Sequence, residues 1–249
     1  MLFRHIKGHP YLKLGEALHT ETGETLVVYQ ALYGDFAQFA RPKPMFESRY
    51  PENDPAAPLR FAPLDEPALA GLPATPTVIR ALFFARQAHE AIGQVRKYTG
   101  EPYWLHPLSV ARRVAEVSAD EALIAAALLH DVVEDTPTPL ERIEQLFGAA
   151  VARLVAEVTN VSRPGDGNRS RRKALDFAHI AKASPAGQTL KLADLLDNIV
   201  SVIERDRDFA RVYLPEKAQL LNALTEGDPR LLRAAQAVLA TAMASLATG

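Results

Sequence analysis

The stretch ADEALIAAALLHDVVED, residues 119–135, decides the fold of this chain. Its middle section, ALIAAALL, is apolar on nearly every side, which is typical of a helix at the centre of a helical bundle. The stretch then ends in a histidine and three acids, Asp131, Glu134 and Asp135, with no basic residue among them. In a helix these carboxylates crowd one face, where like charges repel each other and are poorly solvated. Either bound cations neutralise them, or this helix end is exposed to solvent.

The sequence on both sides of this stretch also favours helices. Residues 77–249 contain a series of helical apolar patterns and no strand pattern. Pro107 suits the first turn of one helix, and residues 138–141 match the capping-box pattern expected at the start of another. We therefore predict a mainly α protein, in which an all-α helical bundle over residues 77–249 follows a small β-rich N-terminal domain.

The first 76 residues differ in composition from the rest of the chain. Residues 1–50 alternate turn signals such as Thr22-Gly23 with short β-branched runs, which predicts the small β-rich domain. Residues 51–76 hold 7 of the 18 prolines, a density that predicts a semi-rigid linker without a regular helix or a paired strand. Leu59 and Phe61 could still pack this linker on a neighbouring element.

Composition restricts the possible functions. A net charge of −2 argues against a dedicated nucleic-acid binder, which would usually be basic. The chain contains no cysteine, so any metal must be held by histidine or carboxylate side chains. It contains no run of 18 apolar residues and no signal-like start. We expect a soluble, cytoplasmic protein with no membrane partner.

A second group of polar residues lies in LKLADLLDNIVSV, residues 190–202. Lys191, Asp194, Asn198 and Ser201 fall on one continuous line of a helix, beside an apolar line. Such a line suits the floor of a binding site, although every bundle helix also has a solvated face. His106, which directly precedes a proline, is by itself more typical of a cap or a packed ring than of a ligand.

Taken together, the polar groups supply two imidazoles and two carboxylates, in the order H…HD…D along the chain. His106, His130, Asp131 and Asp194 would form a ligand set suited to a six-coordinate divalent ion such as manganese. Four protein ligands leave two positions for water and a substrate oxygen, as metal-assisted hydrolysis requires.

The order of these ligands and the residues around them are similar to those of a known family. Four segments carry the similarity: RKYTGEPYWLHPLSVA (96–111), AALLHDVVEDT (126–136), FGAAVARLVAEVTNVS (147–162) and LKLADLLDNI (190–199). They resemble the (p)ppGpp hydrolase domain of RelA/SpoT-type proteins, within the HD-superfamily phosphohydrolases, over roughly residues 80–222. The resemblance implies an HD-domain helical bundle. Since no synthetase segment follows, the chain is similar to a stand-alone small alarmone hydrolase.

The resemblance implies one Mn²⁺ on His106, His130, Asp131 and Asp194. It also implies that Glu134 and Asp135 orient and deprotonate a water beside the ion. The implied reaction removes the 3′-diphosphate of the guanine alarmones ppGpp or pppGpp and leaves GDP or GTP with pyrophosphate. The residues expected to bind this substrate are Arg96, Lys97, Arg172, Lys173, Lys191, Asn198 and Ser201.

Two other functions remain open at this point. The chain could hydrolyse another nucleotide, such as an adenine alarmone or a dinucleotide phosphate, or it could be a non-catalytic regulator that binds an alarmone. One departure from the family pattern affects base recognition. Two additional residues separate His89 from the Gly93-Gln94 pair, so the segment leading to Arg96 is expected to end differently.

The N-terminal segment resembles a short bacterial domain of unknown function through the pattern HxKG…E…VVYxxLYG…RPxxMF. We expect this segment to form a small β-barrel. Its polar and aromatic residues could form a binding face, although core packing explains the aromatic ones equally well; they are His5, Lys7, Tyr29, Tyr33 and Arg41. The sequence does not indicate a partner for this domain.

Overall fold

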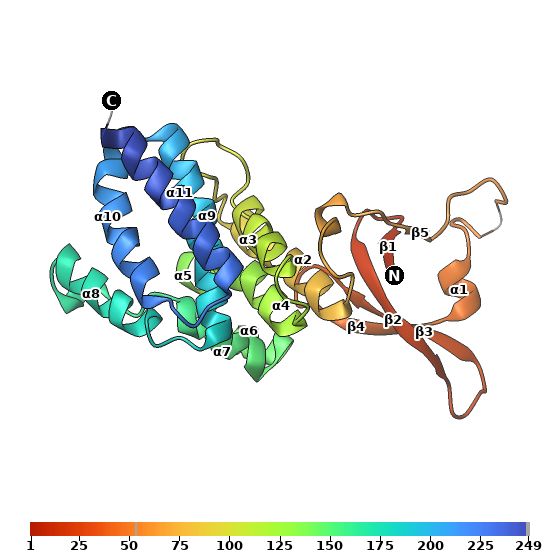
Figure 1. Cartoon of the computed structure of the whole chain (residues 1–249). Coiled ribbons are helices and arrows are strands. Elements are labelled where there is room, and N and C mark those ends of the chain that lie inside the picture. Colours follow the sequence, from red (N-terminus) through yellow and green to blue (C-terminus); the bar gives the residue numbers. More distant parts are fainter. Residues whose placement is uncertain (53, 248–249) are drawn as a thin grey trace. The chain divides into compact units, whose positions relative to one another are not determined.

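The strands lie in the N-terminal part of the chain, and most of the helices follow them (Figure 1). The computed structural model describes residues 1–52 and 54–247 and divides into two units, Met1–Ala70 and Gly71–Gly249. Strands belong to the first unit and most helices to the second, so the predicted mainly α architecture with a β-rich N-terminal unit is confirmed. None of the described helices has the length and apolarity needed to cross a membrane.

The first unit is built on an antiparallel sheet with the strand order β4-β3-β2-β1-β5. The strands are β1 (Leu2–His5), β2 (Pro10–Leu18), β3 (Thr25–Ala31), β4 (Gln38–Pro42) and β5 (Phe61–Pro63). The turn between β2 and β3 uses Gly23 at φ 70°, a conformation that favours glycine. Among the described strands β4 and β5 remain unpaired edges, so the sheet is open and the expectation of a closed barrel is wrong.

The Pro-rich segment contributes a strand to this sheet. Phe61–Pro63 pairs with β1, so the expectation that residues 51–76 contain no paired strand is wrong for these three residues. Pro63 lies on an edge strand, where its missing N–H group is tolerated. The Phe61 ring stacks on Phe46 of α1 (Lys43–Glu47) with 4.2 Å between ring centroids. Both rings are buried, and this apolar burial outweighs the proline content of the segment.

An aromatic core holds the sheet and α1 together. Val27, Tyr29, Phe46 and Phe61 form its buried part, and Phe3 and Tyr11 pack against it. Tyr29, one of the residues suggested for a binding face, is therefore a core residue with only 4% of its surface exposed.

The second unit is a helical bundle. Its helices are α2 (Pro76–Ala91), α3 (Leu105–Ala115), α4 (Glu121–Leu129), α5 (Val132–Asp135), α6 (Leu140–Phe147), α7 (Ala149–Val158), α8 (Arg169–Ile180), α9 (Pro185–Arg205), α10 (Arg207–Ala223) and α11 (Pro229–Ala247). Helix α4 contacts α2, α3, α7 and α9, and every residue from Leu123 to Leu129 is buried. The apolar stretch is thus at the centre of the bundle, as predicted.

The central stretch is not one continuous helix. Helix α4 ends at Leu129 and α5 begins at Val132, with His130 and Asp131 between them. The Nδ1 atom of His130 lies 2.9 Å from the carbonyl oxygen of Ala127. The imidazole therefore satisfies a carbonyl group in the last turn of α4, at the point where the polar residues begin.

We expect Leu128→Ala to lower the free energy of unfolding by about 2–5 kcal/mol, because it leaves a cavity in the centre of the bundle. Leu128 is 1% exposed, whereas Leu175 on α8 is 41% exposed and provides a matched control. Leu175→Ala should change the free energy by less than about 0.5 kcal/mol. Chemical denaturation followed by far-UV circular dichroism measures both, and equal effects would contradict the central position of α4.

Candidate metal centre

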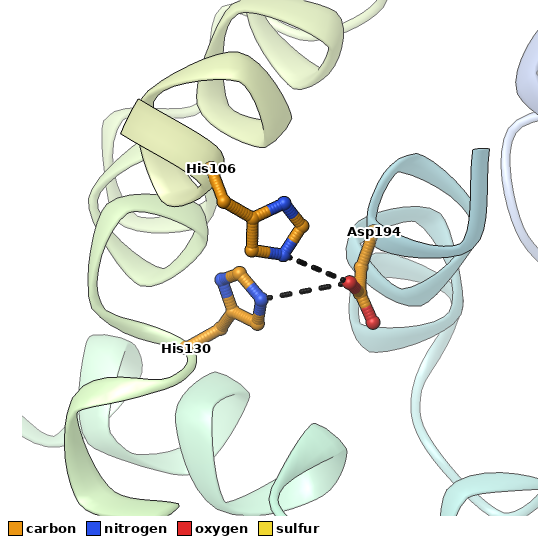
Figure 2. A group of neighbouring side chains, drawn as sticks. All are labelled: His106, His130 and Asp194. Carbon is orange, nitrogen blue, oxygen red and sulfur yellow. Dashed lines mark ion pairs between the residues drawn. The ribbon is translucent and has the colours of Figure 1, made fainter. Parts of the chain in front are cut away.

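Three side chains from separate helices meet inside the bundle. His106 lies in the first turn of α3, His130 follows the end of α4, and Asp194 lies within α9. Figure 2 shows both imidazole rings pointing at the Asp194 carboxylate. Its Oδ1 atom lies 3.3 Å from Nε2 of His106 and 3.7 Å from Nε2 of His130. The three ligand atoms lie within 4.8 Å of one another and all three residues are buried, so the group could hold a metal ion.

Asp131 borders this group. Its Oδ1 atom is 3.1 Å from Nε2 of His130, and its Oδ2 atom is 3.5 Å from Nε2 of His106. The hydroxyl group of Tyr103 donates a hydrogen bond of 2.7 Å to the same Oδ2. The structure therefore brings together all four residues that the sequence suggested as ligands, although Asp131 is outside the set of three with the tightest mutual spacing.

The orientation of each ring fits a bound cation. Nδ1 of His106 lies 2.8 Å from Oδ2 of Asp197, and Nδ1 of His130 lies 2.9 Å from the carbonyl oxygen of Ala127. Because these oxygens accept hydrogen bonds, each Nδ1 carries the proton and each Nε2 of a neutral ring presents its lone pair to the centre. Nε2 of His130 is buried without a hydrogen-bond partner, as expected of a metal ligand. With two nitrogen and two oxygen donors, the site fits a divalent ion.

The buried carboxylates control the protonation of both imidazoles. Burial acts to lower the pKa of His106, but hydrogen bonds to Asp194 and Asp197 outweigh this effect and raise the pKa to about 9. Burial has the same effect on His130, yet Asp131 and Asp194 raise the pKa of this ring well above its usual value. In the absence of a cation, protons on these rings therefore compensate the buried negative charge.

Asp194 is held in place by neighbours on its own helix. Lys191, one turn before it, lies 2.7 Å from its Oδ2, and the side-chain amide of Asn198, one turn after it, donates a 2.6 Å hydrogen bond to Oδ1. Burial acts to raise the pKa of Asp194, whereas Lys191 and the two imidazoles hold it well below its usual range. Ser201 lies two turns beyond Asp194, about 10 Å further along the helix axis.

The two acids that follow Asp131 are each positioned by a loop residue. Asn160 donates to both carboxylate oxygens of Glu134, through its side-chain amide at 2.6 Å and its backbone N–H at 3.3 Å. The side-chain amide of Gln94 donates a 2.8 Å hydrogen bond to Asp135. Burial and the nearby Asp131 carboxylate raise the pKa of Asp135. Both acids are therefore fixed in orientation beside the centre.

The segment with two additional residues forms an ordered loop. His89 is buried, and its Nδ1 atom lies 2.7 Å from the side-chain oxygen of Gln94, while the backbone N–H of Gln94 donates to the carbonyl of His89. The loop ends with Arg96, whose guanidinium lies 3.2 Å from Oδ2 of Asp197. Lys97 is more exposed and lies 5.4 Å from the centre of the Phe209 ring.

A cavity of about 420 Å³ opens beside Lys191, between α8, α9 and α10. Four cationic side chains line it: Arg169, Lys173, Lys191 and Lys217. Of the two basic residues that the sequence suggested on α8, Lys173 lines the cavity, whereas Arg172 is not among its lining residues.

Four residues at the centre were not identified from the sequence: Gln94, Tyr103, Asn160 and Asp197. Asp197 lies three residues after Asp194 on α9, so helical spacing could have indicated it, whereas Tyr103 lies in the turn before α3. Gln94 and Asn160 lie outside helices, and no spacing rule connects them with the acids that they bind.

The chain matches two protein family models and is similar to several curated proteins. A family model of the HD domain matches residues 81–214, and a model of a protein family of unknown function, DUF1653, matches residues 1–63. The chain is 40% identical over 120 residues to guanosine-3′,5′-bis(diphosphate) 3′-pyrophosphohydrolase of Aquifex aeolicus. The aligned region covers 48% of this chain and 17% of that protein. The chain is 40% identical over 123 residues to the bifunctional (p)ppGpp synthase/hydrolase SpoT of Escherichia coli K12, with the same coverage.

The chain therefore spans less than a fifth of the length of these curated relatives. A solved structure agrees over a larger share of both chains. A metazoan ortholog of SpoT, described as hydrolysing ppGpp, superposes with a TM-score of 0.61 and 29% identity, covering 68% of this chain and 97% of the other.

We expect the affinity for Mn²⁺ to rise with pH across the neutral range. The raised pKa values leave His106 and His130 protonated in the metal-free protein, and a metal binds only the neutral ring, so binding releases protons. Affinity should increase up to about tenfold per pH unit for each proton released. Titration calorimetry in two buffers of different ionisation enthalpy counts these protons. A pH-independent affinity would contradict the assignment, and His179→Gln, outside the centre, is the control.

Proposed function

The chain belongs to the HD domain family, and we propose that it is a metal-dependent hydrolase that removes the 3′-diphosphate of (p)ppGpp. The products are GDP or GTP and pyrophosphate. The observation that carries this proposal is the buried convergence of His106, His130 and Asp194, in a chain whose relatives are named for this reaction. The same centre beside a cationic cavity suits a substrate that carries two diphosphate groups.

The proposed cofactor is one Mn²⁺ ion held by His106, His130, Asp131 and Asp194. When bound, such an ion lowers the pKa of a water molecule and stabilises negative charge on phosphoryl oxygens. The protein contributes the fixed ring orientations, because hydrogen bonds to Nδ1 of each histidine direct both Nε2 atoms to one point. Tyr103 fixes the Asp131 carboxylate in the same way.

Glu134 and Asp135 are the proposed catalytic pair. They orient the attacking water and accept its proton, while the water oxygen forms a bond to the phosphorus next to the ribose. The bond between this phosphorus and the 3′ oxygen breaks, and the 3′ oxygen takes up the proton that the acid pair removed from the water. The hydrogen bonds from Asn160 and Gln94 support this role because they hold both carboxylates in fixed positions. The raised pKa of Asp135 makes it a stronger base than an ordinary aspartate.

The proposed substrate contacts lie on two sides of the centre. Arg96, with its planar guanidinium, would stack on the guanine base, and Lys97 would lie beside it. Asn198 and Ser201 continue the polar line of α9 from Asp194. Arg172 would act from the edge of this site, since it does not line the cavity.

The cavity supplies the proposed phosphate contacts. Arg169 is paired with Glu216 at 2.8 Å, whereas Lys173, Lys191 and Lys217 add positive charge around the same space. Burial, together with the like charge of Lys191, lowers the pKa of Lys217 to about 8. A bound polyanion would relieve this repulsion, which supports a substrate with a second phosphate group.

Incubation of the protein with Mn²⁺ and ppGpp should give GDP and pyrophosphate in equal amounts, and chelation of the metal should stop the reaction. Anion-exchange chromatography separates the products. Intact ppGpp beside cleaved ppApp would assign the enzyme to adenine alarmones. If neither nucleotide were cleaved although ppGpp bound, the chain would be a non-catalytic regulator.

Glu134→Gln should lower kcat for ppGpp by about 10²–10⁴-fold, because an amide cannot accept the proton of the attacking water. Steady-state kinetics measure kcat, and calorimetry should show Mn²⁺ affinity close to that of the native protein. Glu141→Gln replaces an exposed acid on α6 and is the matched control. A variant with native kcat would exclude Glu134 from the chemistry.

A further inference from the structure

We infer that Asp197 is a positioning residue that holds the metal ligand His106 and the nucleotide-contacting Arg96 with a single carboxylate. The inference rests on the proposed function for the role of Arg96, while its metal half rests on the geometry alone. Asp197 lies on α9, one turn after Asp194, and contacts side chains from α3 and from the loop that precedes α3.

The carboxylate of Asp197 is buried, with 7% of the residue exposed, and accepts hydrogen bonds at both oxygens. Oδ2 lies 2.8 Å from Nδ1 of His106 and 3.2 Å from the guanidinium of Arg96. Oδ1 accepts a 2.6 Å hydrogen bond from Ser109 and lies 3.6 Å from the guanidinium of Arg113. A buried carboxylate with this many donors has one fixed orientation.

The contact with His106 determines which nitrogen of this ring faces the metal centre. A carboxylate can only accept, so Nδ1 keeps its proton when the ring becomes neutral, and the lone pair is then on Nε2, the nitrogen that faces Asp194 at 3.3 Å. Ser109, one turn along α3 from His106, fixes the other oxygen of Asp197. The two contacts tie α3 to α9 at the level of the centre, so the ring cannot rotate without breaking a buried charged interaction.

The contact with Arg96 holds the side chain of a loop residue against α9. The backbone of Arg96 is bonded within its own loop, to Glu101 and Gly100. Only the side chain of Arg96 reaches α9, where it contacts Asp197, 101 residues further along the chain, and this side chain is 21% exposed. A guanidinium that is bonded along one edge keeps its planar face available for stacking on a base. Asp197 thus reduces the conformational freedom that Arg96 would lose on binding a nucleotide.

His106 and Arg96 do not have separate partners, because both contact Oδ2 of Asp197. His106 and Arg96 approach the same oxygen atom, so loss of the carboxylate disturbs both ligand sites at once. Loss of Arg96 alone leaves His106 with its partner. Metal affinity should therefore depend on Asp197 and not on Arg96, whereas nucleotide affinity should depend on both residues without additivity.

The test measures Mn²⁺ affinity by calorimetry without nucleotide, and GDP affinity at saturating Mn²⁺. Asp197→Asn should weaken Mn²⁺ binding by about 10–100-fold, the usual effect of removing a partner of a metal-bound histidine. Arg96→Ala should leave Mn²⁺ binding unchanged. Both variants should weaken GDP binding, and the double variant should bind GDP no more weakly than Arg96→Ala.

Two further variants make the result specific. Glu157→Gln is the matched control, because Glu157 is a half-buried acid that accepts from Ser184 and Arg153 away from the centre. It should leave both affinities unchanged. If Asp197→Asn does not fold, Ser109→Ala removes one hydrogen bond of Asp197 and should weaken Mn²⁺ binding in the same direction by a smaller factor.

The inference would be overturned if Asp197→Asn bound Mn²⁺ as tightly as the native protein, or if the losses of GDP affinity were additive. The proposed function would still stand in that case, provided that the native protein hydrolysed ppGpp. A native protein that bound Mn²⁺ but neither GDP nor ppGpp would overturn the nucleotide half together with the proposed function. In that case the effect of Asp197→Asn on Mn²⁺ affinity would still decide the metal half.

Discussion

The cost of burying charge in an apolar bundle governs the arrangement of the metal centre. Asp194 is 4% exposed and lies beside a helix whose residues from Leu123 to Leu129 are all buried. An isolated carboxylate there would be strongly destabilising, so it requires compensating partners. Lys191 and Asn198 bind it along its own helix, and the two imidazoles approach it from α3 and from the turn that follows α4. A divalent cation would complete this compensation and take the place of the protons on the rings.

A second set of residues converts this charge cluster into a defined site. Asp197 and the carbonyl of Ala127 orient the histidines, and Tyr103 orients Asp131. Asn160 and Gln94 do the same for the two acids proposed to activate water. Each support comes from an element different from that of the residue it holds, except the Ala127 carbonyl. The site is therefore preorganised by the packing of the bundle, which is the condition for positioning water and phosphate in a reaction.

In the N-terminal unit, the burial of aromatic side chains decides where the last strand forms. Proline content predicted that residues 51–76 would not pair, but Phe61 is buried in the aromatic core and carries its short strand onto the sheet edge. Proline at an edge position does not remove a needed hydrogen bond, so a composition rule was overridden by side-chain burial. Composition divides the chain into residues 1–50, 51–76 and 77–249, whereas the two structural units divide after Ala70.

The sequence by itself determined the helical bundle, its apolar centre and the residue types of the site, because burial and helical spacing depend only on the order of residues. It placed Asp131 and Glu134 near each other, and Lys191, Asp194 and Asn198 on one face. Only the tertiary structure decided which nitrogen of each histidine faces the centre and where the central helix breaks. It also identified Asp197, whose partners lie 91 and 101 residues away. Contacts over such separations depend on how helices pack, and no local pattern encodes that packing.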